Sequence, residues 1–500
     1  MAGRGPGNNP AGVSRGPRCI ERGASFLLAA CIAAGMPLTL SCHAARPAPL
    51  TLDGAWEGDI TVRGKSRALR VVFAPGAASD QTPAAPPSTV SIPDEYALDD
   101  PLLKVTQNGT AVHFELPGEV QPGTFDGTLE RGRLLGSFTG EQDGDPLTGT
   151  FELRRRSSER LGYRTEEVTF RGGEGRLAGT LFLPAARGPH PAIVFYHGSG
   201  PQTRDSYIRY FAARFARDGV AALIYDKRGT GASEGADYRR SSASFDDLAR
   251  DGLAGVALLK QRSDVDATRI GVWGLSQGAW LAALAARQSP DVAFVVMLSG
   301  GGVSPARQEL YDDEVKLRAL GYSEAQVADA IATLRVSDDY IRDGSDANWD
   351  KVQASLAGAK QQPWFRYLDK FPLVLPREAW WHGTDLDYDP RPTLRQIHVP
   401  VLVILGERDM STPAQETARS IREALGDGGN TDVTVTVVPR ADHAIQVAPD
   451  PWLRIRLAGA GGSPAPSQVA PEWDWARPAS GWEDGMALWL VARADRTRAH

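Results

Sequence analysis

Cysteine is nearly absent from the sequence, which contains only Cys19, Cys31 and Cys42, all within the first 42 of its 500 positions. A chain that loses this N-terminal segment has no cysteine at all. Disulfides, thiol nucleophiles and cysteine-ligated metals are then excluded from the mature protein. Its fold must be held by a hydrophobic core, which a chain of this length can supply.

A surplus of basic residues is also missing. The sequence has 55 Lys and Arg against 61 Asp and Glu, a formal net charge of −6. Without excess positive charge to meet a phosphate backbone, nucleic acid is not an expected partner. Hydrophobic residues make up 42% of the chain and charged residues 23%, close to the averages for soluble globular proteins. These values exclude a mostly disordered chain and a polytopic membrane protein, and the length predicts about three structural units.

The first 44 residues have the organisation of an export signal. Residues 1–22 contain four arginines and one acid, an apolar run extends from Ala24 to Cys42, and small residues follow around Ala44. This order is typical of a secretory signal with its cleavage site. A glycine and a proline interrupt the apolar run, so we expect no transmembrane span in the mature chain. Removal of residues 1–44 deletes four positive charges and one negative charge and changes the net charge from −6 to −9.

We therefore predict an exported protein, located in the bacterial periplasm or outside the cell. Two cysteines, Cys31 and Cys42, each end a short segment that resembles a lipid-attachment signal. Simple cleavage near Ala44 and attachment of a lipid to one of these cysteines both stay open.

Residues 50–155 have the pattern of a small β-rich domain. Segments of alternating polar and apolar residues occur at 69–73, 111–116, 123–130, 134–140 and 147–153. Turn signals such as Asn108-Gly109 separate them. Five or more such strands without a helical period predict a small antiparallel barrel or sandwich. A packing or substrate-restricting role and a ligand-binding role both stay open for it.

From residue 160 to residue 500, unbroken apolar strands alternate with helical segments. The strands are predicted at 192–198, 220–226, 269–274, 292–300, 400–406 and 433–439. Continuous apolar runs indicate strands buried on both faces, as in a parallel sheet covered by helices. We expect an α/β fold with a doubly wound, mostly parallel sheet, preceded by the small all-β domain. The long interval 304–399 has helical periodicity and predicts a helical cap insertion.

A G-x-S-x-G pentapeptide, Gly274 to Gly278, follows one of these strands and precedes a helix-forming run. In this context the pattern is typical of a nucleophile elbow, a tight turn that exposes a serine hydroxyl at a helix N-terminus. Side chains at Gly274 and Gly278 would collide with the neighbouring strand and helix. Ser276 is the predicted nucleophile.

A serine hydroxyl is a weak nucleophile and needs a general base. The sequence has only eight histidines, and His443 directly follows the last predicted core strand, where it can reach the serine. His197 belongs to a loop after an earlier strand, and His382 belongs to the insertion. His443 is therefore the predicted base.

The carboxylate that orients this histidine is expected after a strand between nucleophile and base. Asp409 follows the strand at 400–406 and fits that position, and it also precedes a helix start, where an aspartate can act as a cap. Glu407 and Asp442 are the competing acids. Because Asp442 is adjacent to His443, its side chain is expected to point elsewhere. Asp409 is the predicted orienting acid.

The transition state of acyl transfer also needs hydrogen-bond donors for its oxyanion. The loop His197-Gly-Ser-Gly follows the strand at 192–198 and has the position of an oxyanion loop. The backbone N–H groups of Ser199 and Gln277 are the predicted donors.

With these motifs in order, residues 160–500 resemble the α/β-hydrolase superfamily. The segments 197–205 and 225–233 and the elbow are similar to those of exported bacterial hydrolases known as esterases or serine-aminopeptidase-like (S33-type) enzymes, which also carry a β-rich domain before the catalytic one. The resemblance implies hydrolysis of carboxylic esters without metal or cofactor. It also implies that Asp226–Gly231 is a structural loop without catalysis. Gln277 stands where many relatives have His or Glu, which leaves a backbone donor intact.

The sequence thus predicts a serine esterase that acts on a small-molecule ester. A peptidase that uses the same triad on short peptides or amino-acid amides is one alternative, because three acids of the insertion are candidates to hold a free amino terminus. These acids are Asp385, Asp387 and Asp389. A non-catalytic envelope binding protein that kept the fold is the second alternative.

Overall fold

The computed structural model describes residues 51–76, 87–116, 122–142, 145–156, 162–205, 207–236, 243–368, 385–447 and 477–494. The predicted export segment 1–44, with its three cysteines, and His382 lie outside the described residues. Among the described residues, no helix is both long enough and apolar enough to cross a membrane.

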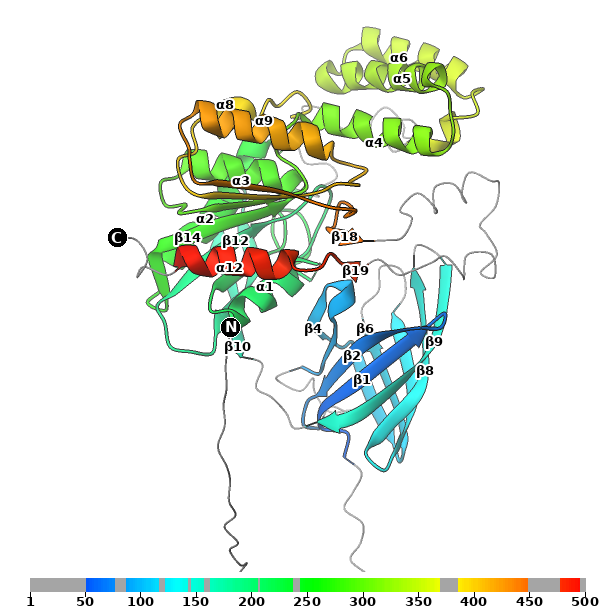
Figure 1. Cartoon of the computed structure of the whole chain (residues 1–500), viewed down its shortest axis with the longest axis vertical. Coiled ribbons are helices and arrows are strands. Elements are labelled where there is room, and N and C mark those ends of the chain that lie inside the picture. Colours follow the sequence, from blue (N-terminus) through cyan, green and yellow to red (C-terminus); the bar gives the residue numbers. More distant parts are fainter. Residues whose placement is uncertain are drawn as a thin grey trace, which may run out of the picture. The chain divides into compact units, whose positions relative to one another are not determined.

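The first described part is a nine-stranded sheet in which every pair of neighbouring strands is antiparallel (Figure 1). Its spatial order is β4-β3-β2-β1-β9-β8-β7-β6-β5. The strands are β1 Gly54–Val62, β2 Lys65–Phe73, β3 Thr89–Ile92, β4 Ala97–Pro101, β5 Lys104–Asn108, β6 Ala111–Leu116, β7 Gly123–Glu130, β8 Arg133–Gln142 and β9 Asp145–Arg156, with a short 3-10 helix η1 at Pro93–Glu95. Among these described strands, the two end strands β4 and β5 do not pair with each other. The predicted barrel or sandwich is therefore an open half-barrel.

The alternating pattern of this sheet places one set of side chains in a core. Along β1, Trp56, Ile60 and Val62 are buried, whereas Glu57 and Asp59 lie on the opposite face. Apolar side chains from the other strands join this core, and each fully buried one contributes about 1.5–3 kcal/mol. The aromatic members include Phe73, Phe114, Phe125 and Phe151, which form stacked and edge-to-face pairs.

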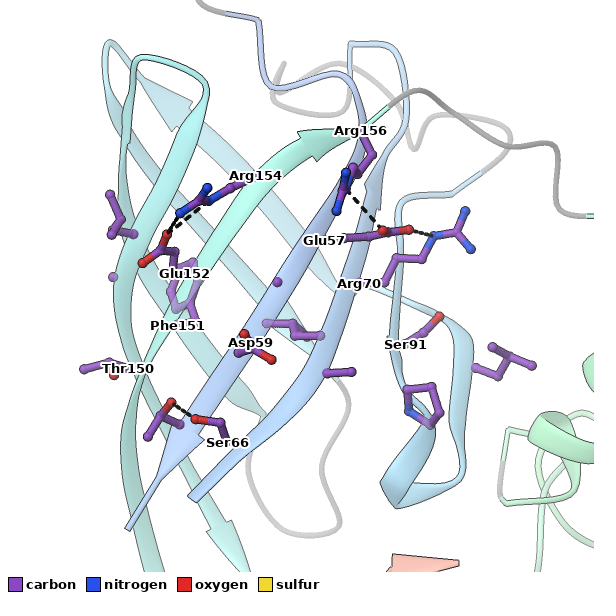
Figure 2. A pocket seen from close by; sticks show the side chains of 18 of the residues that line it. Glu57, Asp59, Ser66, Arg70, Ser91, Thr150, Phe151, Glu152, Arg154 and Arg156 are labelled. Carbon is purple, nitrogen blue, oxygen red and sulfur yellow. Dashed lines mark hydrogen bonds and ion pairs between the residues drawn. The ribbon is translucent and has the colours of Figure 1, made fainter. Parts of the chain in front are cut away.

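The opposite face of β1, β2 and β9 is hollowed and lined largely by polar and charged side chains (Figure 2). Glu57 forms ion pairs with Arg70 at 3.7 Å and with Arg156 at 3.5 Å, and Glu152 pairs with Arg154 at 3.1 Å. The hollow contains none of the predicted catalytic residues. Ion pairs between lining residues are typical of a solvated sheet face.

The second sheet has eight strands in the order β10-β11-β13-β12-β14-β15-β16-β17, and it is parallel from β13 to β17. The strands are β10 Tyr163–Arg171, β11 Arg176–Pro184, β12 His190–Tyr196, β13 Ala221–Tyr225, β14 Val265–Leu275, β15 Val295–Leu298, β16 Val401–Gly406 and β17 Val433–Val438. A separate two-stranded pair joins β18 Gln446–Val447 to β19 Arg477–Pro478. Parallel strands end at the same edge, so the loops after β12, β14, β16 and β17 meet there.

Helices cover both faces of this sheet (Figure 1). Along β12, Val194 and Tyr196 pack into the core under α2, α3 and α9, whereas Ile193 and Phe195 pack into the core under α1 and α12. This alternation explains why the strand is apolar without interruption. The helices are α1 Ile208–Arg217, α2 Phe245–Lys260, α3 Gln277–Gln288, α9 Ala414–Asp427 and α12 Trp482–Ala494.

The interval between β15 and β16 is helical, as its periodicity predicts. It contains α4 Pro305–Ala319, α5 Glu324–Asp343, α6 Asp346–Ala359, the 3-10 helix η3 Phe365–Tyr367 and α8 Arg391–Leu394. Its helices share a core of their own, in which Trp364 is 1% exposed. The insertion contacts a predicted site residue: the hydroxyl of Tyr311 in α4 donates to the carbonyl oxygen of Asp409 at 3.4 Å.

Candidate active site

Ser276 lies at the junction of a strand and a helix, between the end of β14 at Leu275 and the start of α3 at Gln277. Its backbone has φ 56° and ψ −120°, a conformation that non-glycine residues rarely adopt. The turn is held by hydrogen bonds of 2.9 Å from its N–H to the carbonyl of Leu298 and from the Ala279 N–H to its own carbonyl. This strained turn is the geometry of a nucleophile elbow.

Two glycines permit this turn because side chains there would meet backbone atoms. A Cβ on Gly274 would lie 1.9 Å from the carbonyl oxygen of Gly278, at the start of α3. A Cβ on Gly278 would lie 2.4 Å from the carbonyl oxygen of Tyr196, at the end of β12. Both distances are too short for real atoms, which confirms the steric reason predicted for these glycines.

His443 and Asp409 are brought together from the loops after β17 and β16. The His443 Nδ1 atom lies 2.9 Å from Oδ2 and 3.0 Å from Oδ1 of Asp409. The Asp409 side chain is fully buried, whereas the imidazole is 30% exposed. Oδ1 of Asp409 also accepts hydrogen bonds of 2.8 Å from the N–H groups of Ser411 and Thr412. Asp409 therefore both contacts the imidazole of His443 and caps the turn before α9.

The competing acids have other partners. Glu407 Oε2 accepts a hydrogen bond from the N–H of Arg440 at 2.8 Å. Oδ1 of Asp442 accepts from the N–H groups of Ala444 at 3.0 Å and Gln446 at 2.8 Å. These bonds keep both carboxylates in local turns, in agreement with the expectation that Asp442 points away from the imidazole.

The electrostatics of His443 suit a general base. Burial by itself lowers the pKa of the imidazole, but the charge of Asp409 and its hydrogen bond to Nδ1 outweigh that effect, with smaller contributions from Asp442 and Asp312. The net result is a pKa raised above the ordinary value of 6.5. A raised pKa stabilises the imidazolium that forms when a base accepts a proton.

The predicted oxyanion loop lies beside the elbow. A Cβ built on Gly198 would be 3.8 Å from the Cβ of Ser276 and 3.6 Å from the carbonyl oxygen of Leu275. Gln277 is the first residue of α3, and the first N–H groups of a helix have no acceptor within the helix. His197 is 1% exposed and its Nε2–H donates to the carbonyl oxygen of Tyr225. Burial lowers the His197 pKa to about 4, so its imidazole is neutral at neutral pH.

Among the residues that the structure describes, no hydrogen bond joins the Ser276 hydroxyl to His443, and no cluster of three His, Cys, Asp or Glu side chains could hold a metal ion. The Asp409 turn is nevertheless tied to the strand next to the elbow, because the Thr412 hydroxyl donates to the carbonyl of Ser299 at 2.8 Å. In free enzymes, catalytic hydrogen bonds of this kind often tighten only when substrate binds.

Tyr96, the residue between η1 and β4, is a site neighbour that the sequence analysis missed. Its hydroxyl donates to the carbonyl oxygen of Ala444 at 2.9 Å, and its ring packs on Tyr210, Phe211 and Trp482. Ala444 directly follows His443. Because 348 residues separate the two partners, no local pattern in the sequence signals the contact.

Replacement of Tyr96 by phenylalanine is expected to remove this hydrogen bond and to keep the ring packing. Loss of this part-buried hydrogen bond should lower the free energy of unfolding by about 0.5–1.5 kcal/mol, and the looser His443 loop should lower kcat several-fold. Urea unfolding and steady-state kinetics measure the two effects. A variant with wild-type stability and wild-type kcat would show that the contact contributes nothing.

A parallel sheet with a nucleophile elbow after β14 and an Asp–His pair after β16 and β17 defines an α/β hydrolase. The sequence matches the X-Pro dipeptidyl-peptidase (S15) family over residues 172–435, more than half of its length. The chain belongs to this S15 family of α/β hydrolases. The predicted S33-type grouping, and its link to an N-terminal β-rich domain, stay predictions.

Several relatives are hydrolases. The chain is 25% identical to "Esterase EstD" of Thermotoga maritima over 332 residues, which cover 63% of this chain and 70% of that protein. It is 27% identical to "Thiohydrolase apmlB" of Arthrinium phaeospermum over 57% of this chain and 95% of that protein. A solved esterase of Pyrococcus furiosus is 19% identical and covers 67% of this chain and 93% of its own, with a TM-score of 0.41. The family and the sequence relatives support a serine hydrolase.

Proposed function

We propose that the protein hydrolyses carboxylic esters of small molecules through an acyl-enzyme, with Ser276 as nucleophile, His443 as base and Asp409 as orienting acid. The observation that supports this most directly is the buried Asp409 carboxylate on Nδ1 of His443, at the sheet edge where the elbow exposes Ser276. The partner on Nδ1 fixes the tautomer whose Nε2 is available to accept a proton.

The steps follow from these positions. Nε2 of His443 takes the hydroxyl proton as Ser276 attacks the ester carbonyl, and the carbonyl oxygen becomes an oxyanion that accepts from the N–H groups of Ser199 and Gln277. The imidazolium then protonates the leaving alcohol, and the acyl group stays on Ser276. Water activated by His443 releases the acid and restores the serine.

The acids of the insertion favour an ester over an amino-terminal peptide as substrate. Oδ2 of Asp385 accepts from the N–H of Phe245 at 2.6 Å. Asp387 binds the Arg342 guanidinium with two hydrogen bonds, and Asp389 binds the guanidinium of Arg391. Each of the three carboxylates has a structural partner in the fold, so none is placed as a dedicated acceptor for a substrate ammonium group.

A peptidase is the second candidate, because the family to which the chain belongs is described as X-Pro dipeptidyl-peptidase. The same triad can cleave either bond, and the choice depends on how the substrate is held. One preparation of residues 50–500 tested on a series of p-nitrophenyl esters and on Ala-Pro and aminoacyl p-nitroanilides separates the two. We expect kcat/KM for a short-chain ester to exceed that for either anilide by at least about 100-fold.

Labelling with a fluorophosphonate probe accompanies this comparison. Stoichiometric labelling of Ser276 is expected for either hydrolase, whereas a binding protein that kept only the fold would not be labelled. A preference for the Ala-Pro anilide would assign the protein to peptide hydrolysis and contradict the ester proposal.

Export of the mature chain is part of the proposal and rests on the organisation of residues 1–44. The N-terminal residue and mass of the protein purified from the cell envelope or medium test it. A new N-terminus at Ala44 or Ala45 supports simple cleavage, a diacylated Cys31 or Cys42 supports a lipid anchor, and an intact Met1 in the cytoplasm contradicts export.

A further inference from the structure

Lys227 is a buried cation at the oxyanion loop to which the proposed mechanism gives no role. It lies two residues after β13 and is 3% exposed. Its Nζ donates to the carbonyl oxygen of Gly198 at 2.7 Å, to that of Gly200 at 3.0 Å and to Oε1 of Gln277 at 2.8 Å. An ammonium group has three protons, and these three oxygens come from the two separate segments that supply the proposed oxyanion donors.

The contact with Gly198 fixes the direction of one donor. The carbonyl of Gly198 and the N–H of Ser199 belong to the same peptide group, which is planar and trans, so they point in opposite directions. When Lys227 holds that carbonyl oxygen, the Ser199 N–H must point away from Lys227. Rotation of the Gly198–Ser199 peptide group would break the buried, charge-assisted hydrogen bond to Gly198. The second bond, to the carbonyl of Gly200, holds the chain one residue beyond Ser199.

Lys227 also contacts the residue that supplies the second proposed donor. The side-chain Oε1 of Gln277 accepts a hydrogen bond from Lys227, and the backbone N–H of Gln277, at the start of α3, is the other proposed oxyanion donor. Lys227 thereby bridges the oxyanion loop and the elbow across a buried gap. Its charge also polarises the Gly198–Ser199 peptide, which makes the Ser199 N–H a stronger donor.

The loop that carries Lys227 is itself firmly held. The Lys227 N–H donates to the carbonyl of Gln202 at 3.1 Å. The adjacent Asp226 accepts hydrogen bonds from the N–H groups of Arg204 at 2.8 Å and Ala232 at 2.9 Å. The lysine therefore projects from a rigid turn, which suits a side chain that sets the position of others.

Burial lowers the pKa of Lys227 to about 7, so desolvation works against the ammonium form. Two titratable residues lie near it. Asp226 is its neighbour in the chain, and its carboxylate is held by the N–H groups named above. The charge of Lys227 acts on His197, which burial keeps neutral with a pKa of about 4. With this pKa the ammonium form is populated at and below neutral pH, where the acceptors described above, all within 3.0 Å of Nζ, stabilise it.

We propose that Lys227 is a positioning residue that joins the two halves of the oxyanion hole and orients the N–H groups of Ser199 and Gln277 toward the developing oxyanion. This inference rests on the proposed hydrolytic function of Ser276. It also assigns a role within the Asp226–Gly231 loop, for which the family resemblance implies structure alone.

The test compares Lys227→Met with the wild type in the mature protein, with Lys260→Met as the matched control. Lys260 is the last residue of α2 and forms an ion pair with Asp291 at 2.6 Å. Among the described residues, no hydrogen bond or ion pair joins its side chain to a proposed site residue. Active sites are counted with the fluorophosphonate probe, so that rates refer to folded enzyme. For Lys227→Met we expect kcat to fall about 10- to 100-fold with KM changed less than about threefold, because an oxyanion forms only in the transition state.

A trifluoromethyl ketone that binds as a tetrahedral oxyanion provides a second measurement. Its inhibition constant should rise in Lys227→Met by the same factor by which kcat/KM falls, whereas Lys260→Met should match the wild type in both. A Lys227→Met protein with fewer folded molecules, but with wild-type kcat and inhibition per active site, would overturn the inference and leave Lys227 a purely structural residue.

Gln277→Leu is the milder second variant, which removes Oε1 but keeps the backbone donor. It should lower kcat about 3- to 10-fold without a change in KM, and the double variant should be no slower than Lys227→Met alone, because both remove the same bridge. Losses in kcat that multiply in the double variant would contradict the bridge. If Lys227→Met does not fold, Gln277→Leu alone decides, and a wild-type kcat in that variant would contradict the bridge. Absence of both turnover and probe labelling in the wild type would instead refute the proposed hydrolytic function.

Discussion

Replacement of Ser276 by alanine is expected to lower kcat for ester hydrolysis by a factor on the order of 10⁴ to 10⁶. The hydroxyl is the only group that the proposed mechanism joins covalently to the acyl group, so no acyl-enzyme forms without it. The residual rate comes from the oxyanion donors and His443, which can still act on water. Burst kinetics with p-nitrophenyl acetate should lose the burst, and the fluorophosphonate label should disappear.

The fold should survive this change. Alanine adopts the φ of 56° at position 276 at about the same energetic disadvantage as serine, and the backbone hydrogen bonds to Leu298 and Ala279 do not involve the side chain. The midpoint of thermal unfolding is expected to stay within about 3 °C of the wild type. Ser66→Ala, at the exposed start of β2, is the matched control and should keep full activity. A Ser276→Ala protein with more than about 1% of wild-type turnover would remove Ser276 from the nucleophile role.

The candidate catalytic residues could be predicted because each of them follows the end of a strand that is recognisable in the sequence. Ser276 lies in a five-residue pattern, and Asp409 and His443 each follow an apolar strand whose length and composition mark its end. In the structure, the carboxylate of Asp409 contacts Nδ1 of His443, as expected for residues at these strand ends. The steric reason for Gly274 and Gly278 could be stated in advance because a tight turn between a strand and a helix leaves no room for Cβ atoms.

The contacts that support the site were not predictable in the same way. Lys227 is 29 residues from Gly198 and 50 from Gln277. Tyr96 precedes a strand of the first sheet, whereas the loop that it contacts follows a strand of the second. Their partners are backbone carbonyls and one amide, which every segment of a sequence offers, so residue type does not single them out. Alternation likewise predicted the strands of the first sheet but not its open edge, because closure depends on whether β4 meets β5 in space.

Replacement of Asp409 by asparagine is expected to lower kcat about 10⁴-fold, because an amide donates to the imidazole as readily as it accepts and no longer selects the tautomer with a free Nε2. The fold should tolerate it, since the asparagine Oδ1 can still accept from the N–H groups of Ser411 and Thr412. The loss of charge has a second consequence. Asp409 raises the pKa of His443 above 6.5, and without it the balance shifts toward burial, which lowers that pKa.

The pH dependence of kcat/KM therefore distinguishes Asp409 from its neighbours. In the wild type, activity depends on neutral His443, so it should fall as the pH drops through a pKa that lies above 6.5. In Asp409→Asn, this acid limb should move to lower pH while the plateau falls. Asp442→Asn is the matched control. The asparagine Oδ1 can keep the bonds to the N–H groups of Ala444 and Gln446, and no described hydrogen bond joins the Asp442 side chain to the imidazole. It should keep kcat within about threefold and shift the limb slightly in the same direction, since Asp442 contributes a smaller part of the raised pKa. If Asp442→Asn abolished turnover and Asp409→Asn did not, the orienting acid would be Asp442.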